Sequence, residues 1–90
     1  MTNAEILTLL KIDLQISATS LDTYLSTLID AARAFITKEG ITLDDSAEDG
    51  LMVEMYAAYL YRKRRETDTG MPRMLRWAMN NRLFGGKQNG

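Results

Sequence analysis

Residues 47–65, AEDGLMVEMYAAYLYRKRR, form the stretch that decides the fold of this chain. From Leu51 to Tyr61 every residue except Glu54 is apolar. At helical spacing these residues cover most of the helix surface, and a helix that is apolar nearly all round is buried on more than one side. The run is too short to cross a bilayer, which takes about 20 apolar residues. We therefore predict the central helix of a small helical domain, with part of its surface left for another subunit.

The composition limits both the size and the chemistry of the protein. Its 90 residues suffice for one domain, which buries somewhat over about 60% of its unfolded surface. The chain has no cysteine and no histidine, and so it lacks a disulfide framework, a thiolate metal site and the commonest general base. Residues 1–10 contain Glu5 and do not show the basic start and apolar run of a signal peptide. We expect a soluble protein made in a reducing cytoplasm.

Charge is distributed unevenly along the chain. Residues 1–61 contain three Lys or Arg and ten Asp or Glu, for a net charge of −7, whereas residues 62–90 contain eight Lys or Arg and two acids, for +6. Opposite charge at two ends of a molecule favours head-to-tail contact between copies, or binding of the basic end to an acidic partner. Part of the asymmetry has a local explanation, since cations at a helix C-terminus and anions at an N-terminus are stabilising.

Two helices are predicted before the central one. Thr2 and Glu5 have the spacing of a capping box, which predicts a short helix that ends near Lys11. Residues 12–20 begin with alternating apolar and polar side chains and have no helical period, so we expect an extended loop there. Serine and threonine at the end of this loop can cap the second helix. The second helix has a clear apolar stripe and is predicted to end at Gly40, which can adopt the left-handed conformation.

The central helix follows a run of capping residues, and acidic side chains suit its positive N-terminal end. Gly50 lies inside it, where glycine costs roughly 1 kcal/mol relative to alanine. This glycine indicates either local tolerance or the close approach of another backbone. The helix is predicted to end near Glu66, and Pro72 fits the first turn of a fourth helix.

The predicted fold is all-α. It comprises a short first helix, a long antiparallel pair formed by the second and third helices, and a fourth helix that crosses them. Residues 1–84 form the single domain, and residues 85–90 form a flexible tail. The facing stripes of the long pair are predicted to form the core: Leu25, Leu28, Ile29, Ala32, Ile36, Leu51, Met55, Ala58 and Tyr59.

The acidic cluster at the start of the central helix is a candidate metal site. Its members are Asp44, Asp45, Glu48 and Asp49. Acidic residues are routine at a helix start, however, and the cluster lacks the ligand alternation of a calcium loop. The serines and threonines have no histidine to activate them, and the glycines do not form a phosphate-binding loop after a strand. We therefore expect no catalytic site, no metal, no cofactor and no enzymatic activity.

A small helical DNA-binding regulator is the alternative interpretation. Arg73, Arg76 and Asn80 recur on one face of the fourth helix, as in a recognition helix. The basic residues Arg62 to Arg65 can contact phosphates. A helix-turn-helix needs a short turn after a short helix, whereas here a long apolar helix precedes a connector of several residues. A basic surface that faces solvent or another protein is the favoured interpretation.

Four segments follow one another in a recognisable order: MTNAEILTLLKID, LDTYLSTLIDAARAFITKEG, DGLMVEMYAAYLYRKR and MPRMLRWAMNNRLF. They contain a Leu-x-x-Asp-like element (Leu10 to Asp13), a Leu-Ile-x-Ala-Ala-x-x-x-Ile signature (Leu28 to Ile36), an apolar helix that ends in Tyr and basic residues (Ala58 to Arg64), and a closing Leu- and Arg-containing segment (Leu75 to Arg82). In this order the chain, from Thr2 to about Phe84, resembles the head–tail connector (head-completion adaptor) family of tailed bacteriophages.

The resemblance implies a structural role. Connectors of this family form a ring of identical subunits under the portal, extend the DNA channel and provide a docking platform for the next neck or tail protein. The implied partners are copies of the chain itself, the portal protein and that neck or tail protein, with transient, non-specific contact to DNA in the channel and no membrane. The implied location is the neck of the virion, after assembly in the host cytoplasm.

Three groups of candidate interaction residues follow. Candidates for portal docking are Arg82, Leu83, Phe84 and Lys87. Basic candidates for the subunit interface or the channel are Arg62, Lys63, Arg64, Arg65, Arg73 and Arg76, and acidic candidates for the interface are the four residues of the acidic cluster. We expect residues 82–90 to be disordered in the free subunit and to become ordered on a partner. The alternative is that Leu83 and Phe84 cap the fourth helix against its own core.

Overall fold

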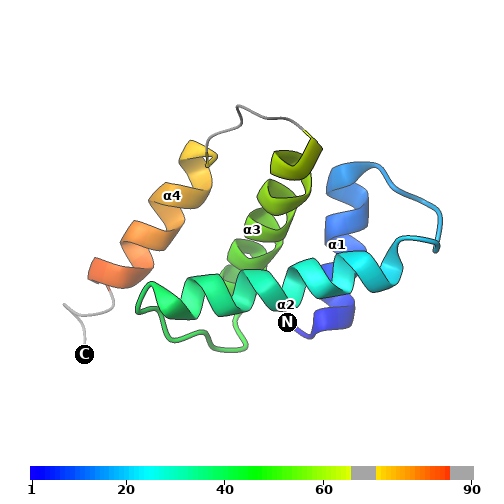
Figure 1. Ribbon diagram of the computed structural model, residues 1–90. Helices are drawn as coiled ribbons and strands as arrows, with labels where there is room; N and C mark the ends of the chain where they lie inside the picture. The colour runs from blue at the N-terminus through cyan, green and yellow to red at the C-terminus, as the bar shows by residue number, and fades with distance from the viewer. Residues whose placement is uncertain (66–70, 86–90) are drawn as a thin grey trace.

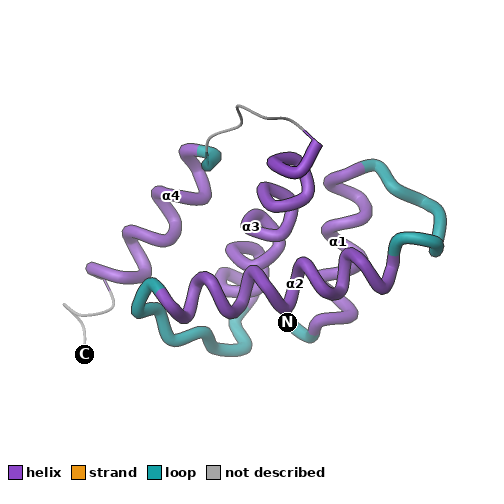
Figure 2. Tube along the Cα trace, in the orientation of Figure 1, coloured by secondary structure: helices purple, strands orange, loops and turns teal. Residues whose placement is uncertain are grey.

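The computed structural model describes residues 1–65 and 71–85, and there the chain is an all-helical domain. Its helices are α1 (Asn3–Leu14), α2 (Asp22–Lys38), α3 (Ala47–Arg65) and α4 (Arg73–Asn80), followed by a short π-helix, η1 (Asn81–Gly85) (Figure 1). No strand occurs in the described residues (Figure 2). The predicted all-α fold is therefore confirmed. None of the helices in these two ranges is long and apolar enough to span a membrane.

Helix α3 is the centre of the domain, as its sequence predicts. It contacts α1, α2 and α4, and Val53 and Ala57 in its middle are completely buried. Figure 1 shows α2 running across α1 and α3. The two long helices cross in this view, and so the antiparallel arrangement predicted for them is not confirmed.

Helix α1 is longer than predicted. Its N-terminal capping box is present, but the helix continues through Leu14 and ends at Gln15, which is left-handed with φ of 58°. The extended segment predicted after Lys11 is therefore wrong for its first residues. Leu14 extends the row of the buried Leu10 and packs against the core, while Ile12 is left at the surface with 68% of its area exposed.

The sequence predicts the C-terminal end of α2 correctly but not the cap at its N-terminal end. The N-cap position is Leu21, and no side chain caps the helix. A backbone turn leads into it instead, because the Asp22 amide donates to the Thr19 carbonyl oxygen at 3.1 Å. At the other end the prediction is confirmed: Gly40 is left-handed with φ of 99°, and Ile41 after it is buried.

The glycine inside α3 is explained by a close approach of the N-terminus. A Cβ atom added to Gly50 would lie 2.7 Å from Cβ and 2.8 Å from Cγ of Met1. The Met1 amino group is itself held in place, because it donates to the Asp45 carbonyl oxygen at 2.6 Å. The close approach is therefore made by a side chain, and not by the backbone of another segment.

The predicted core is mostly confirmed. Six of its nine members are buried, namely Leu25, Ile29, Ala32, Ile36, Ala58 and Tyr59. Leu28 and Met55 are half-buried at its edge. Leu51 is wrongly predicted: it is 45% exposed and lines a groove between α3 and α4.

Truncation of a core residue on α2 should reveal how much the helix packing stabilises the domain. Ile29 is completely buried, and Ile29→Ala is expected to lower the free energy of unfolding by about 2–5 kcal/mol. Leu51→Ala removes a comparable side chain from an exposed position and should change it by less than about 1 kcal/mol. Urea denaturation followed by circular dichroism measures both. Equal effects of the two substitutions would contradict the packing described.

Candidate functional site

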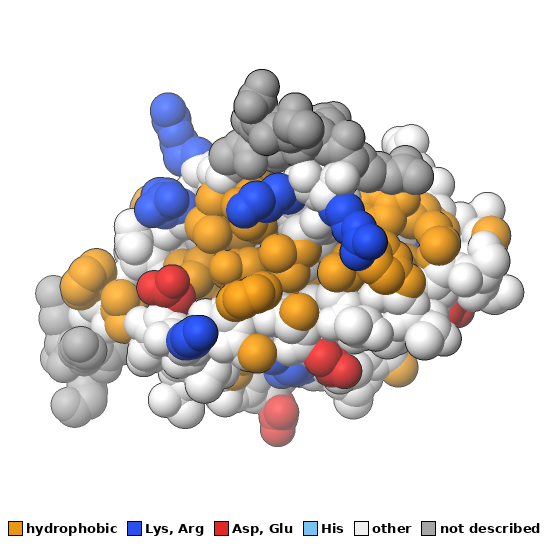
Figure 3. Space-filling model, in the orientation of Figure 1, with side chains coloured by type: hydrophobic (Ala, Val, Ile, Leu, Met, Phe, Trp, Pro, Cys, Tyr) orange, Lys and Arg blue, Asp and Glu red, His pale blue; other side chains and the backbone are white. Residues whose placement is uncertain are grey.

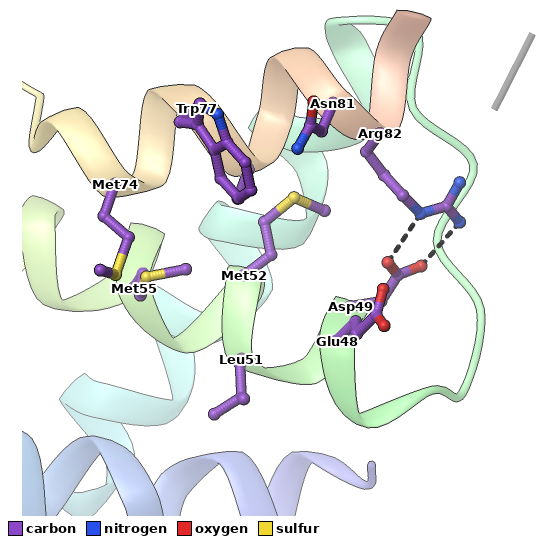
Figure 4. A pocket seen from close by; sticks show the side chains of 10 residues that line it. Glu48, Asp49, Leu51, Met52, Met55, Met74, Trp77, Asn81 and Arg82 are labelled. Carbon is purple, nitrogen blue, oxygen red and sulfur yellow. Dashed lines mark hydrogen bonds and ion pairs between the residues drawn. The ribbon is translucent and has the colours of Figure 1, made fainter. Parts of the chain in front are cut away.

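An apolar groove between α3 and α4 is the main candidate site (Figure 4). Its volume is about 480 Å³, within the range of roughly 300–1,000 Å³ that is usual for binding pockets. The α3 wall consists of Leu51, Met52 and Met55, and Met74 and Trp77 extend toward it from α4. We call this feature the α3–α4 groove.

The groove is lined by side chains that suit contact with another protein. Met74 is 70% exposed and Trp77 is 64% exposed. Tryptophan is enriched at the energetic centres of interfaces, and methionine adapts its shape to irregular partners. Trp77 is also the single tryptophan of the chain, so its fluorescence reports on this groove alone.

One end of the groove is closed by an ion pair between η1 and the start of α3. Arg82 donates from Nε and from one terminal nitrogen to the two carboxylate oxygens of Asp49, each at 2.8 Å. The same terminal nitrogen donates to the Thr42 carbonyl oxygen at 2.7 Å, and it lies 3.5 Å from a carboxylate oxygen of Asp44. These carboxylates, with Glu48, raise the pKa of the Arg82 guanidinium further above its ordinary value, and the hydrogen bond to Asp49 is the main cause.

This ion pair corrects the predicted disorder of Arg82, while portal docking stays a prediction. Arg82 binds within its own subunit, and Leu83 packs against the core, with its Cδ1 atom 3.5 Å from where a Cβ of Gly40 would lie. Disorder is therefore wrong for these two residues. The alternative had both Leu83 and Phe84 cap the fourth helix against its own core, and the structure places only Leu83 there. Phe84 stays 59% exposed. Lys87 lies outside the described residues.

The acidic candidates have mainly structural roles at the start of α3. Ser46 caps the helix, because its hydroxyl oxygen accepts from the Asp49 amide at 3.1 Å. Asp44 accepts from the Ser46 amide at 2.8 Å, and this hydrogen bonding lowers the pKa of the Asp44 carboxyl. Asp45 and Glu48 are exposed. Within the described part of the chain, no group of three metal-ligating side chains comes together.

The basic candidates are spread over several surfaces. Arg62 pairs with Asp13 of α1 at 3.2 Å. Lys63 lies 5.6 Å from the centre of the Tyr59 ring, and Arg64 lies at the same distance from that of Tyr24. The side chain of Arg65 is outside the description. Arg73 and Arg76 are exposed on α4, and so the structure does not gather the five described side chains into one site.

A second exposed apolar feature lies on α2 and was not predicted. Phe35 is 45% exposed, and its ring stacks on that of Tyr56 with the ring centres 5.9 Å apart. Tyr56 in turn meets the edge of Tyr59, over which Lys63 lies. Lys38 follows Phe35 by one helical turn and is exposed. We call Phe35, Tyr56, Lys38 and Lys63 the Phe35 surface.

The face of the molecule that α2 crosses has a large exposed apolar area. In Figure 3 hydrophobic side chains gather over its middle, with Lys and Arg side chains along the upper border. Exposed apolar area that is bordered by polar groups is typical of a protein-interaction site. The position of Phe35 beside the apolar stripe of its helix was visible in the sequence, but its stacking on α3 was not.

A buried carboxyl group lies between α3 and α1. Glu54 is only 7% exposed, and its Oε2 atom has no hydrogen-bond partner. Burial is the main cause that raises the pKa of Glu54 to about 8. A hydrogen bond with Asp13 and repulsion from its charge add to this shift, and the charge of Arg62 opposes it. Glu54 is the one polar residue in the apolar run of α3, and its raised pKa favours the protonated form of the carboxyl at neutral pH.

The fold and surfaces define a small helical domain with uncovered apolar surface. A comparison with protein families, with curated proteins and with solved structures finds no match for the chain.

Proposed function

We propose that the chain is a structural subunit that assembles with identical copies into a ring, in the manner of a phage head–tail connector. In this role the ring extends the DNA channel beneath the portal and offers a docking platform for the next neck or tail protein. The observation that supports assembly most strongly is the pair of exposed apolar features, the α3–α4 groove and the Phe35 surface. A ring needs two different, complementary surfaces on each subunit.

The resemblance of the four sequence segments to connectors supports the ring over other assemblies. The opposite charges of residues 1–61 and 62–90 also favour contact between unlike surfaces of neighbouring copies. Light scattering after gel filtration tests the proposal. A species of more than two subunits is the expected result, and a protein that remains a monomer up to millimolar concentration would contradict it.

Self-assembly is expected to weaken as salt rises. Exposed charges are screened over about 10 Å at 0.1 M salt and about 3 Å at 1 M, so the attraction between acidic and basic surfaces falls. Sedimentation velocity at 0.05, about 0.15 and about 1 M NaCl measures the change in assembled fraction. Assembly that is unchanged or strengthened at high salt would show that apolar contact dominates and that the charge asymmetry has no part.

DNA binding is the second candidate function, and the exposure of Arg73, Arg76 and Asn80 on one face of α4 favours it. Lys and Arg that neutralise phosphates release counterions, so binding of this kind weakens steeply with salt. Fluorescence anisotropy with a labelled duplex distinguishes the two candidates. A regulator prefers one sequence over others, whereas a channel protein binds all duplexes alike and weakly.

A further inference from the structure

We infer that the α3–α4 groove of one subunit is the binding site for the Phe35 surface of the next subunit. This inference rests on the self-assembly proposed above and names the two surfaces that meet. The occupant of the groove is therefore a second copy of this chain.

The first argument is the fit between the shapes and chemistry of the two features. The groove is a concave site of about 480 Å³ with methionine and tryptophan walls. Phe35 is an aromatic side chain that is 45% exposed and is supported from behind by the stacked ring of Tyr56. A supported aromatic residue that enters an apolar pocket is the usual centre of a protein interface. Contact of sulfur with an aromatic ring adds to the attraction.

The second argument is charge. At the closed end of the groove the carboxylates of Asp44, Glu48 and Asp49 all act on the single guanidinium of Arg82. When all four groups are ionised, this end has a net charge of −2. Complementary potentials on the two partners fix the register of an interface and suppress wrong partners.

The Phe35 surface has the opposite sign. Lys38 and Lys63 lie beside its aromatic rings and are exposed, and Glu39 is a nearby acid that offsets part of their charge. The lysines of one copy can therefore approach the acidic end of the groove in the next copy. Because the groove and the Phe35 surface are different parts of the subunit, this contact is head-to-tail and can continue from copy to copy.

Two single-surface variants test the inference. Phe35→Glu damages the aromatic feature and leaves the groove intact, whereas Met74→Glu damages the groove and leaves the aromatic feature intact. Each is expected to weaken self-association by at least about 10-fold. Ile12→Glu is the matched control, because Ile12 is as exposed as Met74 but lies outside both features; it should assemble like the wild type.

A mixture of the variants distinguishes head-to-tail contact from other arrangements. One good groove and one good Phe35 surface remain in the mixture, so a complex of one copy of each variant should form and grow no further. If Met74→Glu is combined with Trp77→Phe, the remaining tryptophan reports on the groove of the Phe35→Glu subunit alone. Its emission should shift to the blue on mixing. Groove-to-groove contact predicts instead that Phe35→Glu assembles normally and that mixing has no effect.

The outcomes separate this inference from the proposed function. A wild type that forms rings while both variants also form them would overturn the inference and leave the ring intact. A wild type that stays monomeric, with unchanged Trp77 emission, would overturn both.

Circular dichroism checks that each variant is folded. If Phe35→Glu does not fold, Lys38→Glu takes its place. Reversal of that charge should weaken assembly, and combination with Glu48→Lys should restore it; failure of this rescue would also contradict the inference.

Discussion

Replacement of Arg82 by methionine is expected to lower the free energy of unfolding by about 3 kcal/mol. Arg82 makes two hydrogen bonds of 2.8 Å to Asp49, whose side chain is only 3% exposed. Removal of one partner leaves a buried carboxylate without its counter-charge, which typically costs about 3–5 kcal/mol. The lower end of this range applies because 30% of the Arg82 side chain is exposed. In a domain of this size the melting temperature should fall by roughly 12 °C or more.

Arg73→Met is the control for the arginine substitution. Arg73 is an exposed arginine on the neighbouring helix, and its replacement should change the melting temperature by no more than about 2–4 °C. The double variant Arg82→Met/Asp49→Asn should recover part of the loss, because no charge is then left buried. If Arg82→Met has the same melting temperature as the wild type, the ion pair does not hold η1 against α3.

The second large effect concerns Glu54 and pH. The pKa of this carboxyl is raised from 4.5 to about 8 in the folded protein, chiefly by burial. Between these values the folded state keeps a proton that the unfolded chain has released. Stability therefore falls as pH rises from about 4.5 to about 8. The limiting slope is about 1.4 kcal/mol per pH unit, and the total loss is expected to reach a few kcal/mol.

Glu54→Gln should remove this pH dependence. The amide has no proton to lose, and so the variant is expected to be more stable than the wild type at pH 8–9 and similar to it near pH 5. Glu48→Gln is the matched control, since Glu48 is an exposed acid on the same helix. Glu5 and Asp44 have lowered pKa values and lose their contributions only below pH 4.5, in a separate window. Thermal melts at closely spaced pH values measure the slope; a wild type with flat stability from pH 5 to 8 would contradict the assignment.

The local elements of the fold could be predicted because local rules determine them. The capping box of α1, the apolar stripe of α2 and the left-handed Gly40 each depend on residues within a few positions of one another. The unusual apolar run of α3 likewise predicted a helix with neighbours on several sides. The end of α1 was missed because Leu14, one helical turn after Leu10, lies between the polar residues Asp13 and Gln15 in the sequence. This alternation looked like an extended segment, although Leu14 packs against the core.

The functional surfaces could be predicted only in part, because they depend on contacts between distant segments. Arg82 and Asp49 are 33 positions apart. The sequence placed Arg82 among the portal-docking candidates and Asp49 among the acidic interface candidates, and it did not predict the ion pair between them. The role of Phe35 in an exposed aromatic surface could not be predicted, because it depends on stacking against the ring of Tyr56 on α3. Leu51 was assigned to the core because a helical pattern shows which residues are apolar, and not where the neighbouring helices leave a groove.

The central claim is that this domain assembles into a closed ring through two unlike surfaces. Negative-stain electron microscopy of the wild type, at a concentration where light scattering detects assembly, tests it most directly. The claim predicts class averages of a closed ring with a central opening, and it predicts that Met74→Glu abolishes these particles while Ile12→Glu does not. Compact dimers, open filaments or particles that appear only with DNA would contradict it.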